Sequence, residues 1–339
     1  MRVATWRGAT EFTIDDRADL HPGAGEVVVR VDSVGVCGTD VHITQGLFPA
    51  TAPEVLGHEG SGVVVETGAG VAASRIGERV VMDITSHCGQ CESCRTWSLS
   101  RCERLQRSTG FYAELARLPG ASAHGIPDDM SFELAALTEP ASCCLSGVQR
   151  LNVEPGMSAV VIGGGIMGQL SLAYLKRAGA GTTILSEPFP SRREAAGAVG
   201  ADVLHDPAER PLAEVVQELT DGRGVHIAVE AVGKPELVAA CSKMVRPRGD
   251  VLMMGVCPEG THLPVDLYDF HYREVRLQGA FGRGNVFEQA LGTLQELPVS
   301  GLISGAYPLE AVAQAIADSG AGKGVKLMVK PNARPSAAR

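Results

Sequence analysis

Short valine-rich runs bounded by glycine and proline occupy the first 80 residues of the chain. Residues 26–31 (EVVVRV) and 62–66 (GVVVE) have the length and composition of strands. Such a pattern predicts a small barrel or a folded sheet. Further along, Ser131 is followed by Phe132, Glu133 and Leu134, which places an early acidic residue after a good N-cap residue. We therefore expect a helix to begin near Ser131.

A different pattern begins near residue 147, where apolar strand runs alternate with helical runs. The expected helices are 170–178 and 193–198, and the expected strands are 159–162, 183–185, 227–229, 251–254 and 275–277. This alternation is typical of a doubly wound parallel sheet and predicts an α/β fold. From about residue 291 the pattern stops, and one helix (309–317) and one strand (325–329) follow. A chain of 339 residues suits two domains of ordinary size.

The composition is that of a soluble globular protein, with 45% hydrophobic and 20% charged residues. A net charge of −9 argues against a nucleic-acid partner, because a phosphate backbone favours clustered Lys and Arg. Residues 1–7 lack the apolar segment of a signal peptide, and glycines interrupt the longest apolar run, around residues 159–175. We therefore expect a cytoplasmic protein with no membrane partner. Its nine cysteines are expected to be metal ligands or core residues rather than disulfides.

A glycine-rich turn follows the strand expected at 159–162. It has the form GxGxxG, and its predicted cofactor-binding residues are Gly163, Gly165, Ile166, Met167 and Gly168. Between a strand and a helix, the second motif glycine lets a pyrophosphate approach backbone N–H groups, and the third lets the helix pack closely on the strand. The positive end of the helix dipole then faces the phosphates. We predict a dinucleotide site here; the alternative is a glycine turn in another α/β fold.

An acidic residue ends the next predicted strand. Glu187 follows the motif by about twenty residues, where a carboxylate binds the adenosine ribose. It would accept a hydrogen bond from the ribose 2′-hydroxyl and repel a 2′-phosphate, so NAD is expected in preference to NADP. Arg192 and Arg193 lie close by in the sequence and would favour the opposite preference. Arg192 is kept as a further cofactor-binding candidate.

Four cysteines lie close together in a segment, residues 88–102, that shows no helical or strand period and is interpreted as a loop. They have the spacing C-x2-C-x2-C-x7-C and are Cys88, Cys91, Cys94 and Cys102. Four thiolates suit a tetrahedral zinc ion with no open position, which is a structural site. A [4Fe–4S] cluster is the rival interpretation, because the first three spacings overlap with those of ferredoxins. A closed site does not by itself indicate an enzyme.

Three further residues, Cys37, His58 and Glu139, are candidate ligands of a second metal ion. Taken singly, Cys37 could be a core thiol, His58 a turn histidine and Glu139 a surface charge. They are far apart in the sequence, so spacing alone does not join them.

The segments around these residues resemble the zinc-dependent medium-chain alcohol dehydrogenases. Residues 57–71 match that family's zinc signature, GHE-x2-G-x5-G-x2-V, and residues 37–40 read CGTD. Together with the four-cysteine loop and GxGxxG, they occur in the family's order, over the chain to about residue 330. The resemblance implies a GroES-like β-rich catalytic domain (1–146 and 291–339) and a Rossmann domain (147–290), with the active site in the cleft between them.

The same resemblance implies a catalytic zinc ion held by Cys37, His58 and a carboxylate. Three protein ligands leave one position for water or the substrate oxygen. Glu139 occupies the matching third position and is slightly preferred. Glu59 is the neighbouring carboxylate that can replace or approach the third ligand in similar enzymes, so both glutamates remain candidates.

A proton route is also implied by the resemblance. Thr39 would take the proton from the substrate oxygen and pass it through the nicotinamide ribose to His42. The alternative for His42 is a surface histidine.

The sequence therefore predicts an NAD-dependent oxidoreductase with two zinc ions per chain, acting on a secondary alcohol or its ketone. Residues 37–49 are most similar to the polyol branch, so a polyol, cyclitol or aminocyclitol is expected, with a butanediol- or threonine-type dehydrogenase as the alternative. A segment that looks shortened, from Cys102 to Phe111, predicts an unusually shaped pocket. A homo-oligomer, dimer or tetramer, is expected. The rival classes are a zinc-free quinone-reductase-like enzyme and a non-catalytic dinucleotide-binding protein.

Overall fold

The computed structural model describes residues 1–96, 98–108 and 110–333. The chain divides into two compact units, of which the first comprises residues 1–139, 287–295 and 303–339. The second comprises residues 140–286 and 296–302. Residues 334–339, the end of the segment expected in the catalytic domain, lie outside the described residues.

The first unit is built on a seven-stranded sheet centred on β3 (Glu26–Gly35). Along one edge β3 pairs antiparallel with β5 (Glu59–Thr67). Along its other edge the first half of β3 pairs antiparallel with β9 (Leu115–Pro119) and its last two residues with β18 (Lys326–Lys330). The remaining strands are β6 (Arg79–Asp83), β10 (Ala123–Gly125) and β17 (Ile303–Pro308). The valine-rich runs that predicted strands at 26–31 and 62–66 lie within β3 and β5. Their inward valines pack in the core with Met82, Phe111 and Tyr112.

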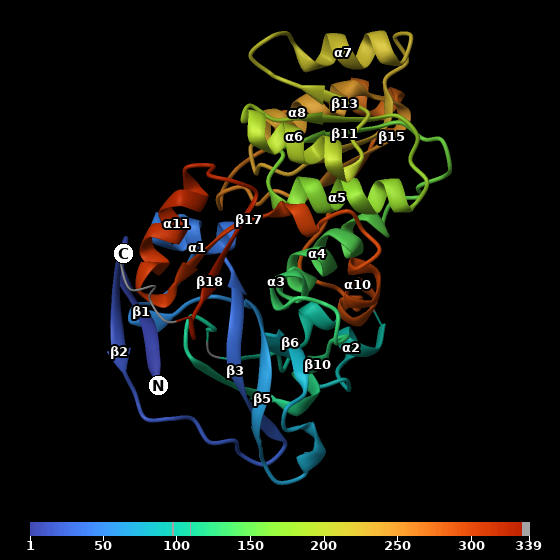
Figure 1. Cartoon of the computed structure of the whole chain (residues 1–339). Coiled ribbons are helices and arrows are strands. Elements are labelled where there is room, and N and C mark those ends of the chain that lie inside the picture. Colours follow the sequence, from blue (N-terminus) through green and yellow to red (C-terminus); the bar gives the residue numbers. More distant parts are fainter. Residues whose placement is uncertain (97, 109, 334–339) are drawn as a thin grey trace. The chain divides into compact units, whose positions relative to one another are not determined.

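Smaller elements complete this unit. A three-stranded sheet has the order β2-β1-β4, formed by β1 (Arg2–Gly8), β2 (Glu11–Asp16) and β4 (Glu54–Val55). The helices are α1 (Gly38–Thr44), α2 (Glu92–Thr96), α3 (Phe132–Ala136), α10 (Phe287–Leu294) and α11 (Val312–Gly320), with α4 (Thr138–Val148) continuing into the second unit. Helices α1 and α11 pack side by side (Figure 1). The predicted cap of α3 is confirmed, because the Ser131 hydroxyl accepts a hydrogen bond from the Leu134 N–H.

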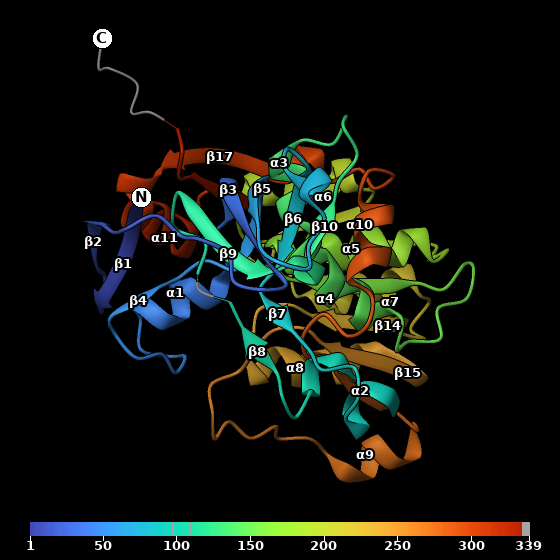
Figure 2. The same ribbon diagram turned by 90° about the horizontal axis from the view of Figure 1, so that it is seen from below.

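The prediction that residues 88–102 form a plain loop is wrong in part. The segment contains α2 and a 3-10 turn, Leu99–Arg101. Helices this short cannot show an amphipathic period, so no pattern in the sequence reveals them. Just outside the segment, β7 (Thr85–Ser86) and β8 (Gln106–Arg107) pair and close its base (Figure 2).

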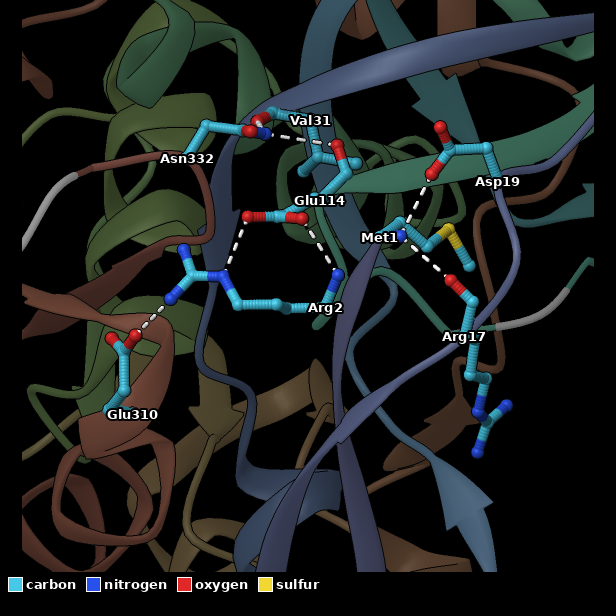
Figure 3. A network of polar contacts seen from close by, with 8 residues as sticks. All are labelled: Met1, Arg2, Arg17, Asp19, Val31, Glu114, Glu310 and Asn332. Carbon is cyan, nitrogen blue, oxygen red and sulfur yellow. Dashed lines mark hydrogen bonds and ion pairs between the residues drawn. The ribbon is translucent and has the colours of Figure 1, made fainter.

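A polar network fastens the two ends of the described chain to this unit (Figure 3). The Arg2 guanidinium pairs with Glu114 at 2.8 Å and also with Glu310, from the C-terminal part of the chain. Asn332 donates hydrogen bonds to the carbonyl oxygens of Val31 and Glu114. The C-terminal return is therefore tied both to β3 and to the strand at the N-terminus.

The second unit contains a six-stranded parallel sheet of order β13-β12-β11-β14-β15-β16. Its strands are β11 (Ala159–Ile162), β12 (Thr183–Ser186), β13 (Val203–His205), β14 (Val225–Glu230), β15 (Val245–Met253) and β16 (Arg276–Gly279). The helices are α5 (Ile166–Arg177), α6 (Pro190–Val199), α7 (Leu212–Leu219), α8 (Pro235–Met244) and α9 (Leu267–Tyr272). The doubly wound sheet is confirmed, with α5 and α7 on opposite sides of it in Figure 1. The strand order reverses at β11, where such folds bind ligands at the carboxyl ends of their strands.

No helix in the described part of the chain is both long and apolar enough to span a bilayer.

Candidate metal and cofactor sites

Cys37 lies where β3 ends and α1 begins. Its sulfur accepts a hydrogen bond from the Thr39 N–H at 3.4 Å, and its own N–H donates to Asp40 Oδ2 at 3.0 Å. This reciprocal pair is a capping box with cysteine as the N-cap residue. Local backbone geometry therefore fixes the thiol at the amino end of a helix.

His58 directly precedes β5 and faces the same cap. Its Nδ1 lies 3.8 Å from Asp40 Oδ1, while Asp40 Oδ2 also accepts a hydrogen bond from the Tyr112 hydroxyl at 2.9 Å. A metal-binding histidine commonly directs its other ring nitrogen at a carboxylate, which sets the orientation of the ring. Asp40 is placed to do this for His58.

Ligand atoms of Cys37, His58 and Glu59 all lie within 4.8 Å of one another. Glu59 is fully buried, and its Oε1 has no hydrogen-bonding partner among the described residues. A buried carboxylate oxygen left unpaired is costly unless a cation completes it. The thiol, imidazole and carboxylate donors are also the types that zinc prefers, so this trio fits a zinc ion.

Glu139 lies in the first turn of α4 and does not belong to that group of three. Burial raises the pKa of Glu139 to about 7; the charge of His58 opposes the shift and that of Glu59 adds to it. The structure therefore places Glu59 in the group with Cys37 and His58. Glu139 lies outside that group but near enough to interact electrostatically with it. Both remain candidates for the third ligand.

Thr39 and His42 both lie on α1, and both are partly buried. Residues three apart share a face of a helix. The two proposed members of the proton route are therefore on one face, next to Cys37 in the sequence.

The four cysteines of the loop converge on one point. Their sulfur atoms are separated by 3.4 Å (Cys91 to Cys94), 3.6 Å (Cys88 to Cys102), 3.9 Å (Cys91 to Cys102) and 4.0 Å (Cys88 to Cys94). Tetrahedral zinc with bonds of about 2.3 Å to sulfur requires separations of about 3.8 Å. A four-iron cluster would hold the sulfurs further apart, because each iron takes its own cysteine. The geometry fits a single ion.

Backbone N–H groups also point at these sulfurs. Cys88 Sγ accepts from Gln90 and Cys91, at 3.5 and 3.3 Å, and Cys102 Sγ accepts from Arg104 at 3.3 Å. The N–H groups of Gln90 and Cys91 lower the pKa of Cys88 to about 6. The turn at Gln90 and Cys91 thus stabilises the thiolate of Cys88, the form that binds a metal, whereas burial raises the pKa of Cys94 to about 12.

The glycine-rich turn leaves room for a ligand. A Cβ atom at Gly168 would lie 1.8 Å from the Gly163 carbonyl oxygen, so the packing of α5 on β11 requires glycine there. At Gly165 a Cβ atom would meet no atom nearer than Arg192 Nη1, at 4.0 Å. Gly165 is also the N-cap of α5, whose first N–H groups receive no side-chain cap. Open space at uncapped N–H groups fits a pyrophosphate.

Glu187 is 3% exposed at the end of β12, and both of its carboxylate oxygens accept backbone hydrogen bonds. Oε2 accepts from the Gly164 N–H at 2.6 Å and Oε1 from the Phe189 N–H at 3.0 Å. The Arg192 guanidinium stacks on the Phe189 ring, 5.3 Å from its centroid. Each carboxylate oxygen keeps a second lone pair with which a ribose hydroxyl could bond.

Sequence reasoning missed the residues that support these sites. Asp40 is marked only as the last residue of the CGTD motif, and no motif contains Tyr112, Gln169 or Lys326. Lys326 is fully buried, with Nζ 2.5 Å from Glu59 Oε2. No signal in the sequence marks it, since Lys326 and Lys330 flank the apolar residues 327–329 as charged residues at the two ends of a strand would.

Comparison with known proteins gives the family. Residues 23–128 match the model of the alcohol dehydrogenase GroES-like domain, and residues 167–296 match the zinc-binding dehydrogenase model. The chain is 32% identical to 2-dehydro-3-deoxy-L-galactonate 5-dehydrogenase of Pseudoalteromonas atlantica, over 98% of this chain and 99% of that protein. It is 28% identical to sorbitol dehydrogenase of Bacillus subtilis, over 98% of each.

A solved structure supports the same family. A zinc-binding dehydrogenase from Sinorhizobium meliloti, bound to NADP, has a TM-score of 0.91 and 29% identity, and covers 97% of this chain and 99% of that one. The expected GroES-like and Rossmann domains are confirmed, and both rival classes are set aside. The chain belongs to the zinc-dependent medium-chain alcohol dehydrogenases, in the branch that includes sorbitol dehydrogenase, and is a nicotinamide-dependent oxidoreductase.

Proposed function

We propose that the enzyme interconverts a secondary alcohol and its ketone with NAD(H), and that the substrate is a polyol, cyclitol or aminocyclitol. The observation that carries the proposal is the convergence of Cys37, His58 and Glu59, with an unpaired buried carboxylate oxygen among them. A zinc ion held there would make the substrate hydroxyl more acidic, and the nicotinamide would accept the hydride. Thr39 Oγ1 would accept the hydroxyl proton as it releases its own, and that proton would pass by way of the nicotinamide ribose to His42 and on to solvent.

The domain roles follow the two family models. We assign catalysis to residues 1–146 and 291–339 and cofactor binding to residues 147–290. Every metal-ligand candidate lies in the proposed catalytic domain. The glycine-rich turn, Glu187 and Arg192 lie in the proposed cofactor-binding domain.

The substrate class rests on polar groups at the metal. Thr39, His42 and whichever of Glu59 and Glu139 does not bind the metal would offer hydrogen bonds to neighbouring hydroxyl or amino groups of a polyol. An aliphatic alcohol would leave them desolvated, at a cost of roughly 1–3 kcal/mol for each group left unpaired. The named relatives act on hydroxylated carbon chains, which supports the same class. A butanediol- or threonine-type substrate is the alternative.

Two zinc ions per chain are proposed, one at Cys37 and one in the four-cysteine loop. None of the nine cysteines, all of which lie in the described part of the chain, forms a disulfide, which suits a reducing compartment such as the cytoplasm.

A homo-oligomer, dimer or tetramer, is also proposed. It is supported by β16, an edge strand, and by Leu267, Tyr268 and Tyr272, which are 75%, 69% and 68% exposed on α9.

Replacing a proposed catalytic ligand tests the metal site. Cys37→Ala and His58→Ala should each lower kcat by about a thousandfold or more, because a metal Lewis acid contributes several kcal/mol to the transition state. NAD affinity, measured by fluorescence quenching, should stay within about twofold, since the cofactor residues belong to another unit. His21→Ala, an exposed histidine of the same unit, is the control. Full activity of the Cys37 variant would exclude the proposed ligand set.

The four-cysteine loop should behave differently. Cys91→Ala should lower the melting temperature by on the order of 10 °C and remove one zinc ion per chain, because metal binding there is folding energy. Cys257→Ala, outside both clusters, should change neither quantity. A Cys91 variant as stable as the parent would rule out a structural zinc site.

Cofactor preference tests Glu187. The parent should prefer NAD, and Glu187→Ser should lower the NAD-to-NADP ratio of kcat/KM by about tenfold to a hundredfold, because a charge-assisted hydrogen bond contributes about 1.5–3 kcal/mol. Glu194→Ser, an exposed carboxylate of α6, should leave the ratio unchanged. A parent that already prefers NADP would show that Glu187 does not select the cofactor.

Substrate class is tested by comparing kcat/KM for sorbitol and a cyclitol with that for hexanol, while nicotinamide absorbance is followed. We expect a preference of about tenfold or more for the hydroxylated substrates, because only they pair the polar groups at the metal. Preference for hexanol would overturn the polyol assignment and leave the dehydrogenase assignment standing.

A further inference from the structure

One buried cation faces the proposed catalytic metal site, and the function proposed above gives it no role. Lys326, at the start of β18, is 1% exposed as a residue and its side chain is 0% exposed. Its ammonium donates to the Val36 carbonyl at 2.9 Å and pairs with Glu59 Oε2 at 2.5 Å. Both partners of the ion pair are shielded from water, so neither charge is screened.

The ion pair gives the two carboxylate oxygens of Glu59 different environments. Lys326 holds Oε2, whereas Oε1 has no hydrogen-bonding partner among the described residues. Oε2 also occupies the space left by the missing side chain of Gly35, because a Cβ atom there would lie 2.1 Å from it. Only Oε1 is therefore left to serve a metal ion.

The charges around Lys326 also support a role for it at the metal site. Cys37, Glu59 and Glu139 all lie near enough to Lys326 to act electrostatically on its ammonium group. Ionised, these three groups carry three negative charges. A divalent ion and Lys326 together would neutralise them, whereas a divalent ion alone would leave a buried anion in excess.

We propose that Lys326 is a positioning residue for the catalytic metal site: by holding Glu59 Oε2 it restricts that carboxylate to one oxygen and so preserves the open coordination position. The inference rests on the function proposed above. Without the ammonium, Glu59 would present both oxygens, and its second oxygen would occupy the position that the substrate needs.

Cobalt substitution tests this inference without relying on turnover. The visible spectrum of Co²⁺ reports coordination number, and its thiolate band reports Cys37. The contribution of this site is the part of the spectrum that Cys37→Ala removes, so the four-cysteine loop does not confuse the assignment. Lys326→Met should weaken the d–d bands by at least twofold, as expected for a fifth ligand, slow the loss of metal to a chelator severalfold and lower kcat at least tenfold.

Two further variants and one control complete the series. Lys326→Arg keeps the charge and should restore the parental spectrum, whereas Lys326→Gln keeps a donor for Val36 without the charge and should resemble the Met variant. If Lys326→Met does not fold, the comparison of the cobalt spectra of Lys326→Arg and Lys326→Gln tests the role of the charge. Lys330→Met, two residues along β18 and paired with Asp32 and Glu133, should leave the spectrum unchanged.

The outcomes separate the two proposals. A parent with no cobalt signal that depends on Cys37 would overturn the proposed function itself. A parental signal that persists unchanged in the Gln and Met variants would overturn only the role of Lys326, and a lower melting temperature with that unchanged spectrum would make Lys326 a structural residue.

Discussion

Charge buried away from water is the constraint on which the first unit depends. A carboxylate and an ammonium as deeply buried as Glu59 and Lys326 cost several kcal/mol each to desolvate, and only close pairing returns that energy. The pairing requires three strands from distant parts of the sequence to keep one register. Gly35 on β3 lies opposite Glu59 on β5 and also opposite Met328 on β18. A slip of one residue would turn these side chains to opposite faces.

The second unit fixes its ligand-binding turn with buried polar groups as well. Both backbone polar groups of Gly164 are hydrogen-bonded to side chains. Its N–H donates to Glu187 Oε2, and its carbonyl oxygen accepts from the Gln169 side-chain amide. Gln169 also donates to the Arg192 carbonyl, which links the turn to α6. Glycine would otherwise make this turn flexible, and the hydrogen bonds remove that freedom before a cofactor binds. The glycine-rich turn is therefore ordered although its glycines would allow many backbone conformations.

Much of this could be predicted from the sequence, for a physical reason. The strands at 159–162 and 183–185 and the cap at Ser131 depend on neighbours along the chain, so a local pattern reveals them. The four-cysteine site is also local, because its ligands lie within one short loop. Lys326 and the third metal ligand are different. Their roles depend on which distant carboxylate approaches in space, and a lysine at the end of an apolar run has the pattern of an exposed strand end.

The two polar centres have no residue in common. Every candidate ligand and its support lie in the first unit, and the glycine turn with Glu187, Gln169 and Arg192 lies in the second. Groups that share no partner change free energies additively, whereas groups in one network do not. A substitution at one centre is therefore expected to leave the other unchanged, since ion pairing orders the first and backbone hydrogen bonds order the second.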